Sequence, residues 1–226
     1  FCYLLFPNLI FSFVASMLFM FHPIHTEVVA NIKSIDEILS FMLCISACIF
    51  LIRYVQTKNI KSLVLTSVCF FAALLSKESS ITFLAIFPLL ILLKSDKKAT
   101  SFNWSEVLKP MLTLAVFALL FLMIRHSVLS KIASGDPSIA DNLLMAAKSY
   151  DQKFATAVLI LGMYLKLLFI HHQLVFDYSY NQIPLVGIGN MWFILSLLIH
   201  TGLLIWAVII WKKNKLLSFT ILFYFI

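Results

Sequence analysis

Long runs of apolar residues constrain the fold of this chain more than any other feature. Of its 226 residues, 62% are hydrophobic and 12% are charged, whereas a soluble domain is about one quarter charged. A helix crosses a membrane with roughly 17 to 25 apolar residues. Suitable runs lie at about Leu4–Phe21, Ile38–Tyr54, Ser62–Leu75, Ile81–Leu93, Leu108–Ile124, Phe154–Ile170, Met191–Trp211 and from Leu216 onward. The sequence therefore predicts an all-α polytopic membrane protein with about seven to eight hydrophobic segments, forming one transmembrane domain over residues 1–226.

The basic residues are grouped beside the apolar runs. A formal net charge of +7 could indicate nucleic-acid binding, but the basic residues form no single extended patch. They lie in short groups: Arg53, Lys58 and Lys61; Lys94, Lys97 and Lys98; and Lys212, Lys213 and Lys215. Such groups are typical of cytoplasmic loops between membrane helices. We therefore expect an integral, multi-pass membrane protein whose partners include membrane lipid and not nucleic acid.

The first two basic groups also predict the orientation of the chain. If they lie inside, the outer side receives residues 21–39, the SKESS segment at 76–80 and residues 125–153. Most carboxylates then lie outside, namely Glu27, Asp36, Glu37, Glu78, Asp136, Asp141, Asp151 and Asp177. This outer face would belong to a plasma or inner membrane, or to the endoplasmic reticulum in a eukaryote. Two interpretations remain open: a polar site at the membrane surface, or ordinary loops solvated by charge.

The run Phe154–Ile170 creates a conflict in this topology. If it spans fully, the last basic group ends outside; if it is re-entrant or interfacial, that group ends inside, as the positive-inside bias requires. The second option also suits Lys166, which is costly at mid-bilayer. We favour it and expect an outer loop with a re-entrant segment over residues 125–190.

The stretch FHPIHTEVVANIKSIDEIL at residues 21–39 is the first polar cluster between apolar runs. Pro23 cannot continue a helix interior, so the first span should end near Phe21. We expect His25 and Glu27 in a turn, with Thr26 or Asn31 able to cap the next helix. Zinc ligation by His22, His25 and Glu27 is conceivable, but their spacing is not that of a helical H-E-x-x-H motif. A hydrogen-bonded interfacial cluster is favoured, and no metal is predicted.

Two further segments combine charge with apolar surroundings. In SKESS, Lys77 and Glu78 stand between two apolar runs; they fit helix-end charges that reach the headgroups, or a cation aimed at a phosphate. The segment YLKLLFIHHQLVFDYSYNQIP carries Lys166, Asp177 and Tyr178. Its aromatics fit an interfacial belt, or a surface that binds lipid headgroups or sugars.

Three motifs in these segments resemble one known family. HPIHTEVVANIKSIDEIL resembles the H-P-[IV]-H-T-E-x-V-A motif of the transmembrane and tetratricopeptide-repeat-containing O-mannosyltransferase family. LLSKESSITFL resembles its L-x-x-K-E-x-x-[IL]-T segment. Arg125 with Asp141–Asn142, followed by YLKLLFIHHQLVFDYSYNQIPLV, is similar to the family's signature domain, with R…D-N, then Y-x-x-x-L, D-[YW]-S and I-P. The matches occur in the family's order and cover about Phe21–Val186.

The resemblance implies a GT-C glycosyltransferase fold with an active site at the outer membrane surface. Such enzymes transfer a sugar, usually mannose, from a polyprenyl-phosphate donor to Ser or Thr of exported proteins, generally with inversion. No cofactor beyond this donor is expected, and a divalent metal is not favoured. In this fold the catalytic base usually comes from a first outer loop, which would precede Phe1. Since the chain starts at Phe1 and stops inside an apolar run, we expect an internal fragment that lacks this loop and a C-terminal repeat region.

The resemblance and the residue types together suggest roles for the polar residues. A hydroxyl nucleophile needs a carboxylate base, and a lipid-phosphate leaving group needs cationic stabilisation. The residues expected to shape the acceptor and base region are His25, Glu27, Asp36 and Glu37. The candidates for donor phosphate are Lys33, Lys77, Arg125 and Lys166. The candidates for sugar or acceptor contacts are Glu78, Asp141, Asp177 and Tyr178.

Two departures from the family pattern keep other functions open. Ile35 stands where the family has Arg, which leaves Lys33 as a substitute or weakens the enzyme, and His171 or His172 replaces a proline before D-Y-S. One alternative is therefore a non-catalytic membrane anchor or assembly protein with a tetratricopeptide-repeat tail. Another is a transporter of lipid-linked glycans, suggested by the short spans around SKESS and by the re-entrant segment.

Overall fold

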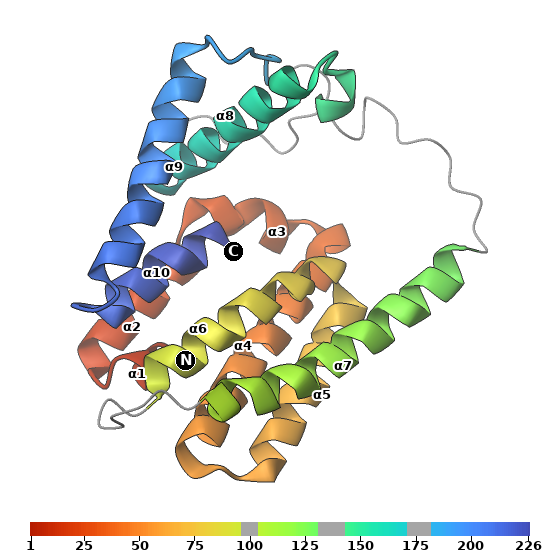
Figure 1. The fold of residues 1–226 in the computed structure, drawn as a ribbon, viewed down its shortest axis with the longest axis vertical. Coiled ribbons are helices and arrows are strands. Elements are labelled where there is room, and N and C mark those ends of the chain that lie inside the picture. The colour runs from red at the N-terminus through yellow and green to blue at the C-terminus, as the bar shows by residue number, and fades with distance from the viewer. Residues whose placement is uncertain (96–103, 131–142, 171–181) are drawn as a thin grey trace. The chain divides into compact units, whose positions relative to one another are not determined.

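The computed structural model describes residues 1–95, 104–130, 143–170 and 182–226 (Figure 1). All regular structure in these ranges is helical, which agrees with the predicted all-α class. The α-helices are α1 (Cys2–Leu5), α2 (Leu9–Met20), α3 (Thr26–Ala30), α4 (Ile35–Thr57), α5 (Ile60–Ser76), α6 (Phe83–Lys94), α7 (Trp104–Leu129), α8 (Tyr150–Phe169), α9 (Met191–Ile210) and α10 (Lys215–Phe225). Short 3-10 turns lie at η1 (Pro23–His25), η2 (Ile32–Ser34), η3 (Glu78–Thr82) and η4 (Leu143–Ala146).

Among the described residues, four helices are long and apolar enough to cross a membrane. They are Ile32–Thr57, Trp104–Leu129, Tyr150–Phe169 and Met191–Ile210, and a fifth span is counted if α2 and the segment Pro23–Ala30, bent by 47°, act together. Each of the eight apolar runs contains a helix. However, α5, α6 and α10 have only 17, 12 and 11 residues. A membrane protein is therefore supported, but the count of seven to eight segments is not confirmed.

Contacts divide the chain into two compact units, and the prediction of a single transmembrane domain stays a prediction. Unit 1 comprises Phe1–Ala133 and Ile210–Ile226. At its centre α4 and α5 form a helical hairpin, because Lys58 adopts a left-handed conformation (φ 53°) and Asn59 caps the start of α5. The hairpin packs on α6 and α7 around a core in which the Phe70 and Phe87 rings meet edge to face at 5.1 Å.

The segment after α2 is more helical than predicted. The α2 helix ends at Met20, near Phe21 as the proline at position 23 predicts. His25 lies in the 3-10 turn η1, as predicted, whereas Glu27 lies in α3 rather than in a turn. The reason is that proline is favoured at the first position of a helix as well as after its end. Asn31 acts as a cap, as predicted, by accepting a hydrogen bond from the Lys33 amide at 3.0 Å.

Unit 2 comprises Ser134–Ile209 and is built on α8 and α9. Side chains join the two helices along their first turns. The Phe154 and Phe193 rings lie 6.0 Å apart, and the Ser196 hydroxyl donates to the Val158 carbonyl at 2.6 Å. The segment before α9 is tied to the start of α8 as well, because the Val186 amide donates to the Thr156 hydroxyl at 3.1 Å.

These contacts tie the segment before α9 and the first half of α9 to the first half of α8. The α8 helix is unbroken over its 20 residues and is long and apolar enough to cross a membrane. Whether this segment spans fully or is re-entrant stays a prediction.

Candidate functional site

The first turn of α4 is charged, and the turns that follow it have one buried face. Ser40, Cys44, Ala47, Cys48 and Leu51 are buried on one face, and Asp36 precedes Ser40 by one helical turn. Asp36 and Glu37 occupy the first turn of α4, where the helix dipole favours negative charge. The two carboxylates therefore stand where the apolar core of unit 1 gives way to a polar surface.

Lys77 joins both carboxylates. Its Nζ lies 2.9 Å from Asp36 Oδ2 and 3.0 Å from Glu37 Oε1. All three side chains are partly exposed. Hydrogen bonds from the ammonium group to the two acids raise the pKa of Lys77 above its usual value. Lys77 is thus held as a cation, but two carboxylates already surround it.

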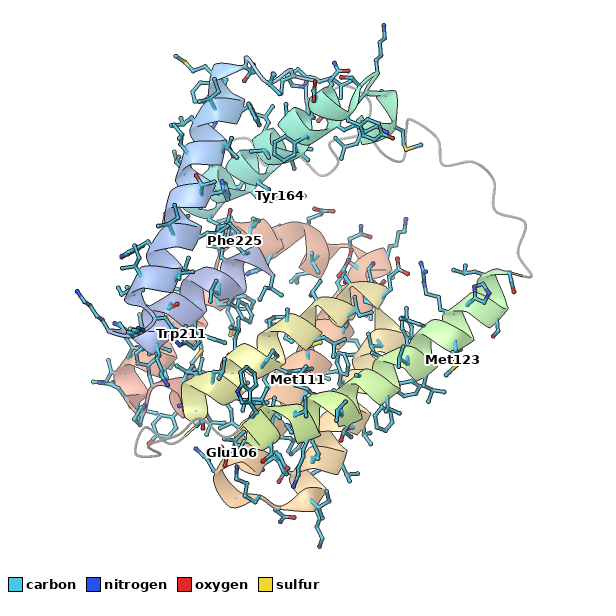
Figure 2. The ribbon with its side chains drawn as sticks, viewed as in Figure 1. Glu106, Met111, Met123, Tyr164, Trp211 and Phe225 are labelled. Atoms are coloured by element: carbon cyan, nitrogen blue, oxygen red, sulfur yellow. The ribbon has the colours of Figure 1, made fainter. Side chains whose placement is uncertain are left out.

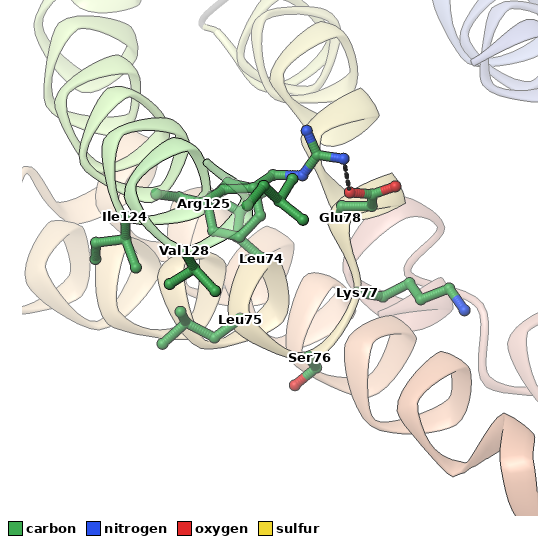
Figure 3. A pocket seen from close by; sticks show the side chains of 10 residues that line it. Leu74, Leu75, Ser76, Lys77, Glu78, Ile124, Arg125 and Val128 are labelled. Carbon is green, nitrogen blue, oxygen red and sulfur yellow. Dashed lines mark ion pairs between the residues drawn. The ribbon is translucent and has the colours of Figure 1, made fainter. Parts of the chain in front are cut away.

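Glu78, the residue after Lys77, forms a second ion pair. Its Oε2 lies 2.6 Å from Arg125 Nη2, near the end of α7. In Figure 3 the Arg125 side chain meets Glu78, while the Lys77 side chain points away from both. We call Lys77 and Glu78, with their partners Asp36, Glu37 and Arg125, the polar corner of unit 1. Neighbouring residues of one short segment thereby connect α4 to α7.

A pocket of about 470 Å³ adjoins the polar corner. Lys77, Glu78 and Arg125 line it together with apolar side chains that include Leu74, Leu75, Phe121, Ile124 and Val128 (Figure 3). A second hollow of about 350 Å³ lies on Glu78, Ile81, Phe121 and Arg125. The Arg125–Glu78 pair therefore borders two hollows. Their linings combine a guanidinium with hydrocarbon surface, which suits an amphiphile with an anionic group.

Buried hydroxyls hold the polar corner in place, and sequence reasoning missed them. Ser80 Oγ lies 3.1 Å from Ser40 Oγ and 3.1 Å from the Ala73 carbonyl oxygen, and both serines are almost fully buried. This contact fixes η3 against α4 one turn below Asp36. A serine at i+4 from an acid on an apolar helix was the available sequence signal, but its partner lies 40 residues away.

The other residues expected at the base region lie apart from this ion-pair network. His25 packs against Phe19 with ring centroids 4.4 Å apart and planes tilted by 47°, and its ring centroid lies 5.9 Å from that of His22. Glu27 is exposed on α3. Within the described ranges, no ion pair joins Glu27 or Lys33 to the polar corner. Lys77, rather than Lys33, is therefore the cation that meets the acids following Ile35.

The remaining candidates lie in unit 2 or outside the described residues. Lys166 lies on α8 in unit 2, whereas Lys77 and Arg125 belong to unit 1. Asp141, Asp177 and Tyr178 fall in the ranges 131–142 and 171–181, which lie outside the described residues. Their predicted roles stay predictions.

The opposite end of α7 carries a separate ion pair. Glu106 Oε1 accepts from Lys58 Nζ at 3.0 Å, and Figure 2 shows Glu106 at the end of α7 away from Met123.

The residues that the structure describes contain no group of three His, Cys, Asp or Glu side chains arranged to hold a metal. No family model matches the chain, and no curated protein or solved structure gives a match.

Proposed function

We propose that the chain is part of a protein O-mannosyltransferase-like glycosyltransferase that moves a sugar from a polyprenyl-phosphate donor to Ser or Thr of exported proteins. The polar corner carries this proposal. It brings together five of the expected site residues, namely Asp36, Glu37, Lys77, Glu78 and Arg125. The adjoining pocket supplies hydrocarbon surface. Charge beside an apolar pocket is what a lipid-linked phosphate substrate needs.

Within this proposal Arg125 binds the donor phosphate and Lys77 positions the acids. Arg125 has one carboxylate partner, and its side chain is 44% exposed, so a phosphate can reach the guanidinium by displacing Glu78. A planar guanidinium also suits bidentate contact with a phosphate. Lys77 is bound by two carboxylates, whose negative charges offset its positive charge toward a substrate. Its part is to hold Asp36 and Glu37 in a fixed arrangement near the acceptor.

The test of the proposal is sugar transfer by the full-length protein in membranes. Radiolabelled polyprenyl-phosphate mannose and an acceptor peptide with Ser and Thr are supplied, and labelled peptide is measured. Arg125→Gln should lower transfer by about 100- to 1,000-fold, because a donor to the developing phosphate charge is lost. Arg125→Lys should recover part of the activity, and Arg53→Gln serves as the matched control on α4. Absence of peptide labelling by the unmodified protein would exclude the enzyme class.

The same ion pairs favour a second candidate function, a non-catalytic membrane anchor. Each charge of the polar corner already has an opposite partner. A purely structural role, the joining of α4, η3 and α7, is therefore sufficient to explain these ion pairs. This candidate predicts no transfer by the unmodified protein. It also predicts that Arg125→Gln lowers thermal stability while the binding of protein partners is retained.

A further inference from the structure

Unit 2 contains a groove between α8 and α9, which we call the α8–α9 groove. It has a volume of about 560 Å³, within the range of about 300–1,000 Å³ common for ligand sites. Apolar residues of both helices line it, including Leu159, Met163, Leu195 and Ile199, and Pro184 closes one side. Both helices are long and apolar enough to cross a membrane. The groove therefore lies on segments whose natural surroundings are lipid.

Among the described residues that line this groove, Lys166 is the one charged side chain. No described residue forms an ion pair with it. The described acid of α8 is Asp151, which lies 15 residues earlier on the same helix, or roughly 22 Å along the helix axis. A lysine within an apolar membrane helix is costly and usually marks a functional contact. The groove thus pairs a long hydrocarbon surface with an ammonium group that has no described carboxylate beside it.

The Ser196 and His200 side chains that line the groove form hydrogen bonds to other atoms of unit 2. The Ser196 hydroxyl donates to the Val158 carbonyl, and His200 Nδ1 lies 2.7 Å from the Ser196 carbonyl oxygen. His200 is buried. Charge recognition in this groove therefore depends on Lys166, while the rest of the lining favours hydrocarbon.

We propose that the α8–α9 groove binds a phospholipid with a net negative headgroup, its phosphate against Lys166 and one acyl chain along the apolar lining. A small hydrophilic anion would leave the apolar lining uncovered, and a neutral lipid would leave the ammonium without a partner. An anionic amphiphile satisfies both. Trp192 lines the same groove, which provides a reporter for the bound chain.

The experiment uses Trp192 fluorescence in the full-length protein reconstituted in phosphatidylcholine vesicles. Trp104, Trp206 and Trp211 are replaced by Phe, so that Trp192 is the sole tryptophan of residues 1–226; any tryptophans elsewhere in the protein are replaced too. Brominated phosphatidylglycerol or brominated phosphatidylcholine is then titrated as a quencher. We expect phosphatidylglycerol to quench Trp192 at about fivefold lower mole fraction, as one basic residue near anionic lipid would give.

Variants separate the groove from general surface charge. Lys166→Gln should abolish the preference, Lys166→Arg should retain it, and Lys153→Gln, on the same helix outside the groove, should leave it unchanged. If Lys166→Gln fails to fold, Lys166→Met, which keeps the apolar stem, takes its place.

Three outcomes would overturn the proposal. The first is equal quenching by the two lipids, and the second is an equal effect of Lys153→Gln and Lys166→Gln. The third is relief of quenching by unbrominated polyprenyl phosphate at far lower mole fraction than by phosphatidylglycerol, which would make the occupant a polyprenyl lipid.

Discussion

The polar corner of unit 1 and the α8–α9 groove of unit 2 use lysine in opposite ways. Lys77 has two carboxylate partners within 3.0 Å, whereas Lys166 has none among the described residues and faces an apolar groove. Arg125 is intermediate, because one exposed carboxylate binds it. A cation that the protein already neutralises organises its neighbours, and a cation without such a partner is available to a ligand. In our proposals, the number of carboxylate partners therefore separates the residue that positions acids from the residues that bind a ligand.

The largest expected effect tests whether the polar corner depends on the core beneath it. Phe70 is fully buried between α5 and α6, and Phe70→Ala should lower the free energy of unfolding by about 3–5 kcal/mol through the cavity it leaves. Thermal unfolding in detergent measures the loss. The matched control is Phe11→Ala on α2, whose side chain is half exposed. Equal losses in the two variants would show that the hairpin core does not support the site.

Much of this arrangement was predictable from local sequence. The α4 helix with acids in its first turn, the helix end before Pro23 and the charged junction at Lys77 follow from propensity and composition. The partners of these charges did not follow, because Lys77 and Asp36 are 41 residues apart and Ser80 and Ser40 are 40 apart. Local patterns identify a polar end of a helix, but only packing decides which ends meet. For the same reason closeness in sequence does not decide the pairing: Lys77, and not the nearby Lys33, forms the ion pair with Asp36.

The next effect tests the close approach of α8 and α9. A Cβ atom added at Gly162 would lie 2.7 Å from Ser196 Oγ and 2.9 Å from its Cβ, so Gly162→Ala should destabilise unit 2 by about 1–3 kcal/mol. Gly202 on α9 has no atom within 4 Å of an added Cβ, and Gly202→Ala should be neutral or slightly stabilising, because alanine is the better helix former. Protection of α8 amides against hydrogen exchange reports the difference. Similar protection in both variants would contradict the crossing at Gly162.

A smaller effect tests the positioning role assigned to Lys77. In Lys77→Gln, Asp36 and Glu37 lose their shared cation, so their arrangement loosens while Arg125 stays in place. If Lys77 positions the acids, the kcat for sugar transfer should fall while the KM for the lipid-linked donor changes little. Lys77→Arg should restore much of the rate, and Lys61→Gln at the other end of α5 is the control. A rise in donor KM without a change in kcat would instead identify Lys77 as a phosphate ligand.

The smallest effect concerns the stability contributed by the Arg125–Glu78 pair. Both side chains are largely exposed, at 44% and 61%, and exposed ion pairs contribute about 0–1 kcal/mol. In a double-mutant cycle with Arg125→Gln and Glu78→Gln, the coupling energy from thermal unfolding should fall in that range and decrease as salt is added. Since so weak a pair can open readily, Glu78→Gln should also strengthen binding of a polyprenyl phosphate by removing the competing carboxylate. A Glu78→Gln variant that binds the lipid more weakly would show that Glu78 orients Arg125 for the phosphate rather than competing with it.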